Sequence, residues 1–170
     1  MITEFISMRK IDTRIFALAQ QINKAYSDEE VVCICVLKGA YMFFSDLMKS
    51  IVVPSTIDFI RVESYKGTES TSDIKLISEP TIELKGKNVL LVEDIIDTGK
   101  TLKFLLDYFN EKEVQDINVC TLLDKPSRRE VDVSPNYTGF VIPNTFVIGY
   151  GLDFNEEYRH LPYIGSYNDI

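Results

Sequence analysis

This chain of 170 residues has few basic residues, a single histidine and only three cysteines. Its 18 lysines and arginines are outnumbered by 26 acids, and the net charge of −8 argues against binding to a nucleic-acid duplex. His160 has no second histidine with which to hold a metal ion. Cys33 and Cys35 project from one face of the same apolar run, so they cannot easily pair. We therefore expect buried, reduced thiols in a cytoplasmic protein.

The sequence also lacks long hydrophobic runs. No stretch reaches the ~20 apolar residues that a membrane span requires. The N-terminus has neither the basic start nor the apolar run of a secretory signal, so we expect no membrane association. Hydrophobic residues still make up 45% of the chain, which is enough for residues 1–170 to bury a full core as one domain.

Apolar residues recur at helical spacing in some segments and form short apolar runs in others. We expect helices over residues 8–26, 41–50 and 101–110, and strands over residues 31–37, 57–62, 89–92, 118–123 and 145–150. Ile77 and Ile82 indicate a short hairpin arm, and residues 64–74 are polar and small enough to form a mobile loop. Strands that alternate with helices predict an α/β fold, in which helices flank a mainly parallel sheet. Active sites in such sheets lie at the carboxyl ends of the strands.

The segment with the sequence VLLVEDIIDTGKTL, residues 89–102, is the most informative part of the chain. Four apolar residues predict a strand buried on both faces, the acids Glu93 and Asp94 follow, and a small polar turn then opens a helix. Small residues at a helix N-terminus let backbone N–H groups surround a phosphate. Adjacent carboxylates suit sugar hydroxyls and Mg²⁺. The pattern therefore predicts a site for a sugar phosphate.

Two common phosphate-binding motifs are absent. Gly99-Lys100-Thr101 is similar to the end of a Walker A loop, but the required earlier glycine is replaced by Asp94, whose charge would face a triphosphate. No G-x-G-x-x-G follows a strand, which excludes a dinucleotide site of that type. The remaining alternative is an ordinary turn with solvated acids, and the three acids beside a phosphate-type loop make it the weaker interpretation.

Residues 93–99, Glu-Asp-Ile-Ile-Asp-Thr-Gly, resemble the phosphoribosyl-pyrophosphate (PRPP) signature of the type I phosphoribosyltransferases. Four further segments resemble the hypoxanthine-guanine branch of that family, so the resemblance covers nearly the whole chain. It implies the type I phosphoribosyltransferase fold, with a small hood region and a lid at residues 64–74. It also implies Mg²⁺ as cofactor and a homodimer or homotetramer. The implied reaction transfers 5-phosphoribose from PRPP to N9 of hypoxanthine, and of guanine, with release of pyrophosphate.

The resemblance also implies a role for each residue of the site. The residues expected to bind the ribose phosphate are Glu93, Asp94, Asp97, Thr98, Gly99, Lys100 and Thr101. Those expected to bind pyrophosphate are Lys38, Gly39, Ser64, Tyr65, Arg129 and Arg159, with a non-proline cis peptide before Lys38. Those expected to bind the purine are Lys125, Phe146, Val147 and Asp153. Glu93, Asp94 and Asp153 are the expected metal ligands, and Asp97 is the expected general base.

Simpler interpretations of these segments remain open. Lys125 can only donate a hydrogen bond, which favours a 6-oxopurine over adenine. Composition alone would instead make residues 38–40 an ordinary turn, residues 124–129 a solvated basic turn and Phe146 a core residue. Two other functions also stay open, a PRPP-binding regulator without transferase activity and a transferase for another nucleobase. Use of xanthine is not settled by the sequence either.

Overall fold

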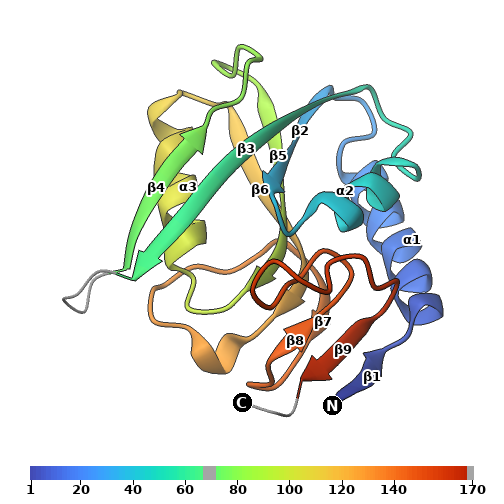
Figure 1. Ribbon diagram of the computed structural model, residues 1–170. Helices are drawn as coiled ribbons and strands as arrows, with labels where there is room; N and C mark the ends of the chain where they lie inside the picture. Colours follow the sequence, from blue (N-terminus) through green and yellow to red (C-terminus); the bar gives the residue numbers. More distant parts are fainter. Residues whose placement is uncertain (67–71, 168–170) are drawn as a thin grey trace.

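The computed structural model describes residues 1–66 and 72–167 of the chain. Its larger sheet consists of β2 (Val31–Leu37), β3 (Ser55–Lys66), β4 (Ser72–Ser78), β5 (Asn88–Ile96), β6 (Asp116–Asp124) and β7 (Tyr137–Val141). A smaller sheet consists of β1 (Ile2–Ile6), β8 (Val147–Ile148) and β9 (Ile164–Tyr167). The helices are α1 (Met8–Ala25), α2 (Tyr41–Met48) and α3 (Lys100–Glu111), and a 3₁₀ turn spans Pro126–Arg128. Figure 1 shows these elements in place.

The larger sheet has the strand order β4-β3-β2-β5-β6-β7. All of its neighbouring strands are parallel except β3 and β4, which form an antiparallel hairpin. In the smaller sheet the order is β1-β9-β8, and both pairs are antiparallel. The mainly parallel sheet predicted from the alternation of strands and helices is therefore confirmed.

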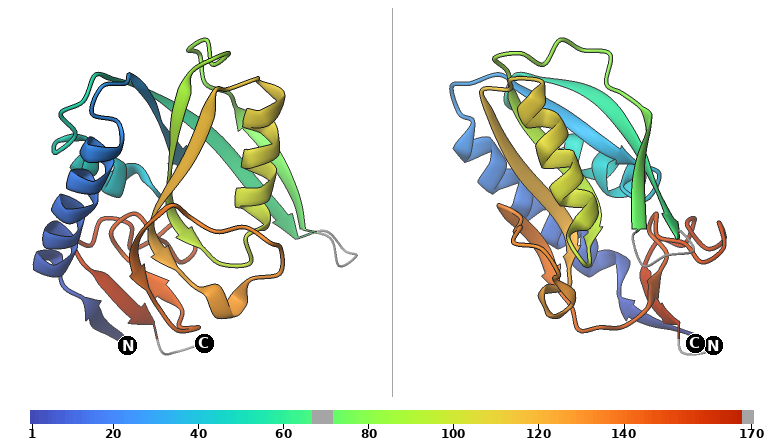
Figure 2. Two further views of the ribbon diagram at one scale, coloured as in Figure 1. Left: turned by 180° about the vertical axis from the view of Figure 1, so that it is seen from behind. Right: turned by 90° about the vertical axis from the view of Figure 1, so that its left-hand side faces the viewer.

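The larger sheet is buried on both faces because consecutive residues of a strand point to opposite sides. Cys33 and Cys35 of β2 belong to the core shared with α1 and α2, whereas Val32 and Ile34 belong to the core shared with α3. The helices accordingly cover opposite faces of the sheet (Figure 2). All three cysteines are buried and unpaired. Within the described residues, no helix is both long and apolar enough to cross a membrane.

Several strands differ from the prediction. β5 continues to Ile96, so Glu93 and Asp94 lie inside the strand rather than after it. The strand predicted at residues 145–150 is only the short β8, and it belongs to the smaller sheet. β1, β7 and β9 were not predicted from the sequence pattern. Such short segments of mixed polarity become strands only because a neighbouring strand completes their hydrogen bonds.

The predicted mobile loop at residues 64–74 is wrong at both ends. Residues 64–66 complete β3 and residues 72–74 begin β4, and Lys66 pairs with Ser72. Polar side chains did not prevent this pairing, because the main chain supplies the hydrogen bonds between strands. The hairpin arm expected near Ile77 is therefore longer than predicted. Residues 67–71, the tip of the expected lid, lie outside the described residues.

The smaller sheet and residues 149–163, which connect β8 to β9, are called the hood below. Figure 1 shows the hood at the end of the larger sheet toward which β2 and β3 run. Val147, Leu152 and Ile164 of the hood join the core that α1 and α2 share with the sheet. The Tyr150 hydroxyl also donates a hydrogen bond to the Asp46 carboxylate in α2. The hood is thus fixed above the carboxyl ends of the strands.

Candidate active site

A cavity of roughly 400 Å³ lies between the carboxyl ends of β2, β3 and β5 and the hood. Most of the predicted site residues line it, namely Gly39, Ser64, Glu93, Asp94, Asp97, Thr98, Gly99, Thr101, Asp153 and Arg159. Lys125, Arg129, Phe146, Val147 and the side chain of Lys100 lie outside this lining, and the Tyr65 side chain lies outside the described part of the chain. The fold therefore brings together the residues expected to bind ribose, phosphate and pyrophosphate.

The turn before α3 and the start of α3 line this cavity with Asp97, Thr98, Gly99 and Thr101. Gly99 caps α3 with a left-handed backbone (φ of 86°), and a Cβ there would lie 2.8 Å from Cδ of Arg129. The first N–H groups of a helix have no acceptor within the helix, so this N-terminus can receive a phosphate. The Lys100 ammonium points elsewhere and pairs with Glu130 at 2.6 Å. Lys100 can therefore bind the phosphate through its backbone N–H group, as expected of this turn, but not through its ammonium in this arrangement.

Glu93 and Asp94 form a carboxylate pair at the end of β5. Burial, and then the neighbouring charge of Asp94, raise the pKa of Glu93 well above its usual range. Burial also raises the pKa of Asp94, although hydrogen bonds and the nearby Arg159 oppose the shift. Oε2 of Glu93 is buried without a hydrogen-bond partner among the described residues. Two adjacent acids, one with an unpaired oxygen, are therefore ready for a cation or for hydroxyl groups.

The carboxylate oxygens of Glu93 and Asp94 are suitable ligands for Mg²⁺, which would then have two protein ligands. No group of three or more acids, histidines or cysteines within residues 1–66 and 72–167 could hold a metal ion together. Asp153 lines the same cavity, but its carboxylate accepts hydrogen bonds from the Glu156 N–H at 2.9 Å and pairs with Arg159 at 2.9 Å. Asp153 therefore does not join the Glu93–Asp94 pair in one group of metal ligands within the described residues, and its expected role as a metal ligand stays a prediction. Mg²⁺ commonly binds one or two carboxylates and completes its shell with phosphate oxygens and water.

Asp97 lies in the turn between β5 and α3 and is held by two consecutive arginines. Nε of Arg128 donates to Oδ1 of Asp97 at 3.0 Å, and Nη1 of Arg129 donates to the Asp97 carbonyl at 2.7 Å. Sequence reasoning missed Arg128, because no local pattern distinguishes it from a solvated turn residue. The remaining donors of Arg129 bind Asp124 at 2.5 Å and the Val133 carbonyl at 3.0 Å. These hydrogen bonds let Arg129 support the phosphate loop, and its expected contact with pyrophosphate stays a prediction.

Lys125 is buried at the end of β6, only 6% exposed, yet its ammonium makes no hydrogen bond within the described part of the chain. Burial lowers the pKa of Lys125, while the charge of Asp97 raises it and that of Arg128 lowers it further. On the hood, Phe146 is 41% exposed, and its ring meets the Phe154 ring edge to face at 5.7 Å. Lys125 offers a free donor and Phe146 an exposed aromatic ring, and both types of group are suitable for a flat heterocycle.

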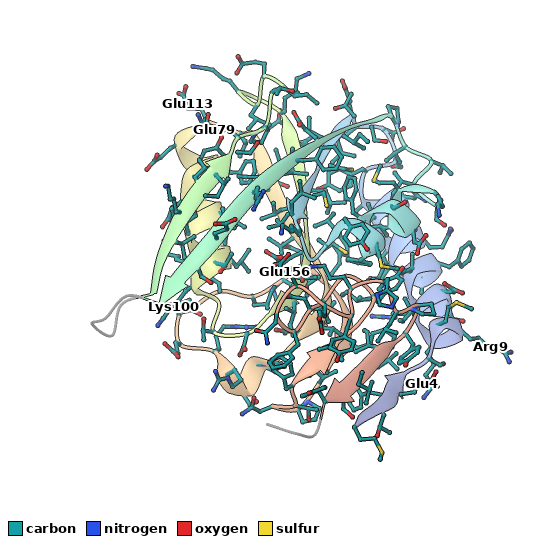
Figure 3. All side chains as sticks on the ribbon, viewed as in Figure 1. Glu4, Arg9, Glu79, Lys100, Glu113 and Glu156 are labelled. Carbon is teal, nitrogen blue, oxygen red and sulfur yellow. The ribbon has the colours of Figure 1, made fainter. Side chains whose placement is uncertain are left out.

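A second pocket, of about 250 Å³, adjoins the first and contains two of the three expected pyrophosphate cations, Lys38 and Arg159. The peptide bond between Leu37 and Lys38 is cis, as the resemblance implied. Nζ of Lys38 lies 2.6 Å from Oε2 of Glu156, and Nη2 of Arg159 lies 3.0 Å from its Oε1. The hydrogen bonds from Lys38 and then Arg159 lower the pKa of Glu156. Figure 3 shows Glu156 on the hood beside the carboxyl end of β2.

Comparison with known proteins agrees with this geometry. The sequence model of the family described as phosphoribosyl transferase domain matches residues 4–155 of this chain. The hypoxanthine phosphoribosyltransferase of Salmonella typhimurium is 45% identical over 160 residues, which cover 92% of this chain and 90% of the relative. The hypoxanthine-guanine phosphoribosyltransferase of Staphylococcus aureus is 45% identical over 150 residues, covering 88% and 84%. A crystal structure of a hypoxanthine-guanine phosphoribosyltransferase from Bacillus anthracis, 45% identical, superposes with a TM-score of 0.93 over 98% of both chains.

Proposed function

This chain belongs to the phosphoribosyl transferase family, and we propose that it transfers 5-phosphoribose from PRPP to N9 of hypoxanthine and of guanine, releasing pyrophosphate. The observation that carries this proposal is the cavity of roughly 400 Å³, where the Glu93–Asp94 pair faces the N-terminus of α3. One end of the cavity suits a phosphate, and the acids suit the ribose hydroxyls beside it. The reaction belongs to purine salvage.

The α3 turn binds the 5′-phosphate through its backbone N–H groups, with Thr98 and Thr101 lining the same end of the cavity. Glu93 and Asp94 bind the ribose hydroxyls. Mg²⁺, held by Glu93 and Asp94 together with ligand oxygens, would neutralise charge on the pyrophosphate as it leaves. Arg129 keeps the loop in place, because it binds the carbonyls of Asp97 and Val133.

Lys38 and Arg159 attract the departing pyrophosphate from the second pocket, and the backbone of Gly39 and the hydroxyl of Ser64 border its path. Asp153 orients Arg159 through their ion pair. Tyr65, in β3, is expected to contact the same group. Exclusion of water during the transfer favours the purine over hydrolysis.

Lys125 donates to the 6-oxo group of the purine, Phe146 stacks on its ring, and the Val147 backbone contacts its edge. Lysine cannot accept a hydrogen bond, so the amino group of adenine would leave a buried cation unpaired. Asp97 accepts the N7 proton as general base. We place the enzyme in the cytoplasm, as a homodimer or homotetramer, where its buried thiols stay reduced.

An assay of pyrophosphate release tests this function directly. The protein is mixed with PRPP, Mg²⁺ and, in turn, hypoxanthine, guanine, xanthine, adenine and uracil. Rapid release with hypoxanthine and guanine, and little with adenine or uracil, is the expected result. Equal turnover of adenine would overturn the assignment of the base. Binding of PRPP without release with any base would identify a regulator.

A further inference from the structure

Glu156 has an unusual position, because it pairs with two of the three cations that line the second pocket, Lys38 and Arg159. The third cation, Arg61, pairs with Glu63. The two carboxylate oxygens of Glu156 lie 2.6 Å from Nζ of Lys38 and 3.0 Å from Nη2 of Arg159. These two cations come from opposite sides of the pocket, Lys38 from the end of β2 and Arg159 from the hood. Glu156 therefore joins the hood to the sheet across the place where pyrophosphate is expected.

The hood backbone holds Glu156 there. Asn155 and Glu156 have left-handed backbones, with φ of 53° and 65°, which are uncommon for residues other than glycine. The Glu156 N–H donates to Oδ2 of Asp153 at 2.9 Å. This turn aims the carboxylate into the pocket, whereas the neighbouring Glu157 uses its backbone to bond Phe154 and makes no ion pair within the described part of the chain.

A carboxylate between two cations has the same charge pattern as one end of a bound pyrophosphate. The same ammonium and guanidinium donors cannot serve both anions fully, so the two must compete. We propose that Glu156 is an internal competitor for pyrophosphate: it occupies the pyrophosphate subsite in the free enzyme, leaves when PRPP binds, and returns as pyrophosphate departs. This inference rests on the proposed function of that subsite.

The exposure of Glu156 and of its pair with Lys38 makes such an exchange feasible, although the side chain of Arg159 is only 19% exposed. The side chains of Lys38 and Glu156 are 46% and 64% exposed, so water replaces most of what either group loses on separation. Exposed ion pairs of this kind are individually weak. The pyrophosphate group of PRPP carries more charge and more oxygens than one carboxylate, so it can displace Glu156. The Glu156 carboxylate still competes for the same cations and therefore lowers the affinity for the pyrophosphate product.

The test compares Glu156→Gln with the matched control Glu157→Gln, which removes the same charge from the next position of the loop. Titration calorimetry of the full chain with pyrophosphate and Mg²⁺ measures affinity, and steady-state kinetics gives separate KM values for PRPP and hypoxanthine. We expect Glu156→Gln to bind pyrophosphate about three- to tenfold more tightly, the range that the loss of two ion pairs allows when one is exposed and the other holds a largely buried guanidinium. The KM for PRPP should fall and that for hypoxanthine should not. Glu157→Gln should differ from the wild type by less than about twofold.

Three results would contradict this inference. Unchanged or weaker pyrophosphate binding in Glu156→Gln would show that Glu156 only supports Lys38 and Arg159. Equal tightening in both variants would show a general effect of net charge. If the wild type and both variants bind neither pyrophosphate nor PRPP, the proposed function itself fails, and the inference fails with it.

Discussion

At the scale of single residues, the contact between Gly39 and Asp94 joins the turn after β2 to the end of β5. A Cβ added at Gly39 would lie 1.7 Å from Oδ2 of Asp94, so any larger residue must displace that carboxylate. Because the obstacle is the end of a side chain, the backbone of β2 and β5 need not move. The glycine is required by the site more than by the fold.

We therefore expect Gly39→Ala to lower kcat/KM for PRPP by at least about tenfold, since displaced ligand groups commonly cost that much or more. The melting temperature should change by only a few degrees. Kinetics and thermal unfolding of the same preparation measure both effects. A fully active Gly39→Ala variant would show that the Asp94 carboxylate has no part in binding PRPP.

Asp97 allows binding and chemistry to be separated. Asp97→Asn keeps the shape of the side chain, but it cannot accept a proton, and loss of a general base commonly lowers kcat by ~10²–10⁴-fold. PRPP affinity measured by calorimetry should change little, because the loop backbone and the acid pair provide it. The opposite outcome, a high kcat with collapsed PRPP affinity, would make Asp97 a structural residue of the loop.

At the scale of elements, Asp58 anchors the segment after the β3–β4 hairpin to the sheet. The buried carboxylate accepts hydrogen bonds from the N–H groups of Phe59, Thr81 and Ile82, at 2.6 to 2.9 Å, and from the Thr81 hydroxyl at 3.0 Å. Burial alone would raise the pKa of Asp58, but these hydrogen bonds outweigh it and lower the pKa. The carboxylate form is thus favoured by folding.

This lowered pKa predicts a specific pH dependence. The stabilisation by Asp58 should be complete above the unfolded pKa near ~3.9 and should be lost as the pH falls through the lower folded value. Asp58→Asn should reduce the free energy of unfolding at pH 7 by roughly 1–3 kcal/mol, because an amide would oppose N–H donors. Urea unfolding at pH 7 and pH 3 measures the difference, which should shrink at pH 3. The control is Asp132→Asn, which replaces an exposed aspartate. An equal loss of unfolding free energy in that variant would show that the hydrogen bonds of Asp58 do not stabilise the fold specifically.

Some elements of the fold can be predicted from the local sequence pattern, and others cannot. β2 was predicted with its observed ends because seven consecutive apolar residues leave no other arrangement in a buried sheet. β9, with the sequence IGSY, has no such pattern, and it becomes a strand because Tyr167 and Ile164 pair with β1 at the other end of the chain. The site follows the same division. Glu93, Asp94 and the α3 turn lie in one recognisable segment, whereas Glu156 and Arg128 reach the site only through tertiary contacts.

At the scale of the whole molecule, catalytic acids in a buried position should reduce stability. Glu93 is 6% exposed, its Oε2 has no hydrogen-bond partner among the described residues, and Asp94 adds a second acid beside it. Burying like charges disfavours the folded state, and the proposed function requires both groups. The apolar packing in the two cores of the molecule must offset this destabilisation.

Replacing Glu93 by Gln should therefore stabilise the protein while it impairs the enzyme. The amide keeps the oxygen that accepts from the Asp94 N–H at 3.3 Å, and its NH₂ group can donate to the Asp94 carboxylate. Without metal, at pH 8, the melting temperature should rise by a few degrees, which corresponds to about 1 kcal/mol for a chain of this size. PRPP turnover should fall in the same variant, and Asp94→Asn should behave alike. A lower melting temperature for Glu93→Gln would mean that the acid pair is a stable part of the fold, and that the molecule gives up no stability to hold its ligand.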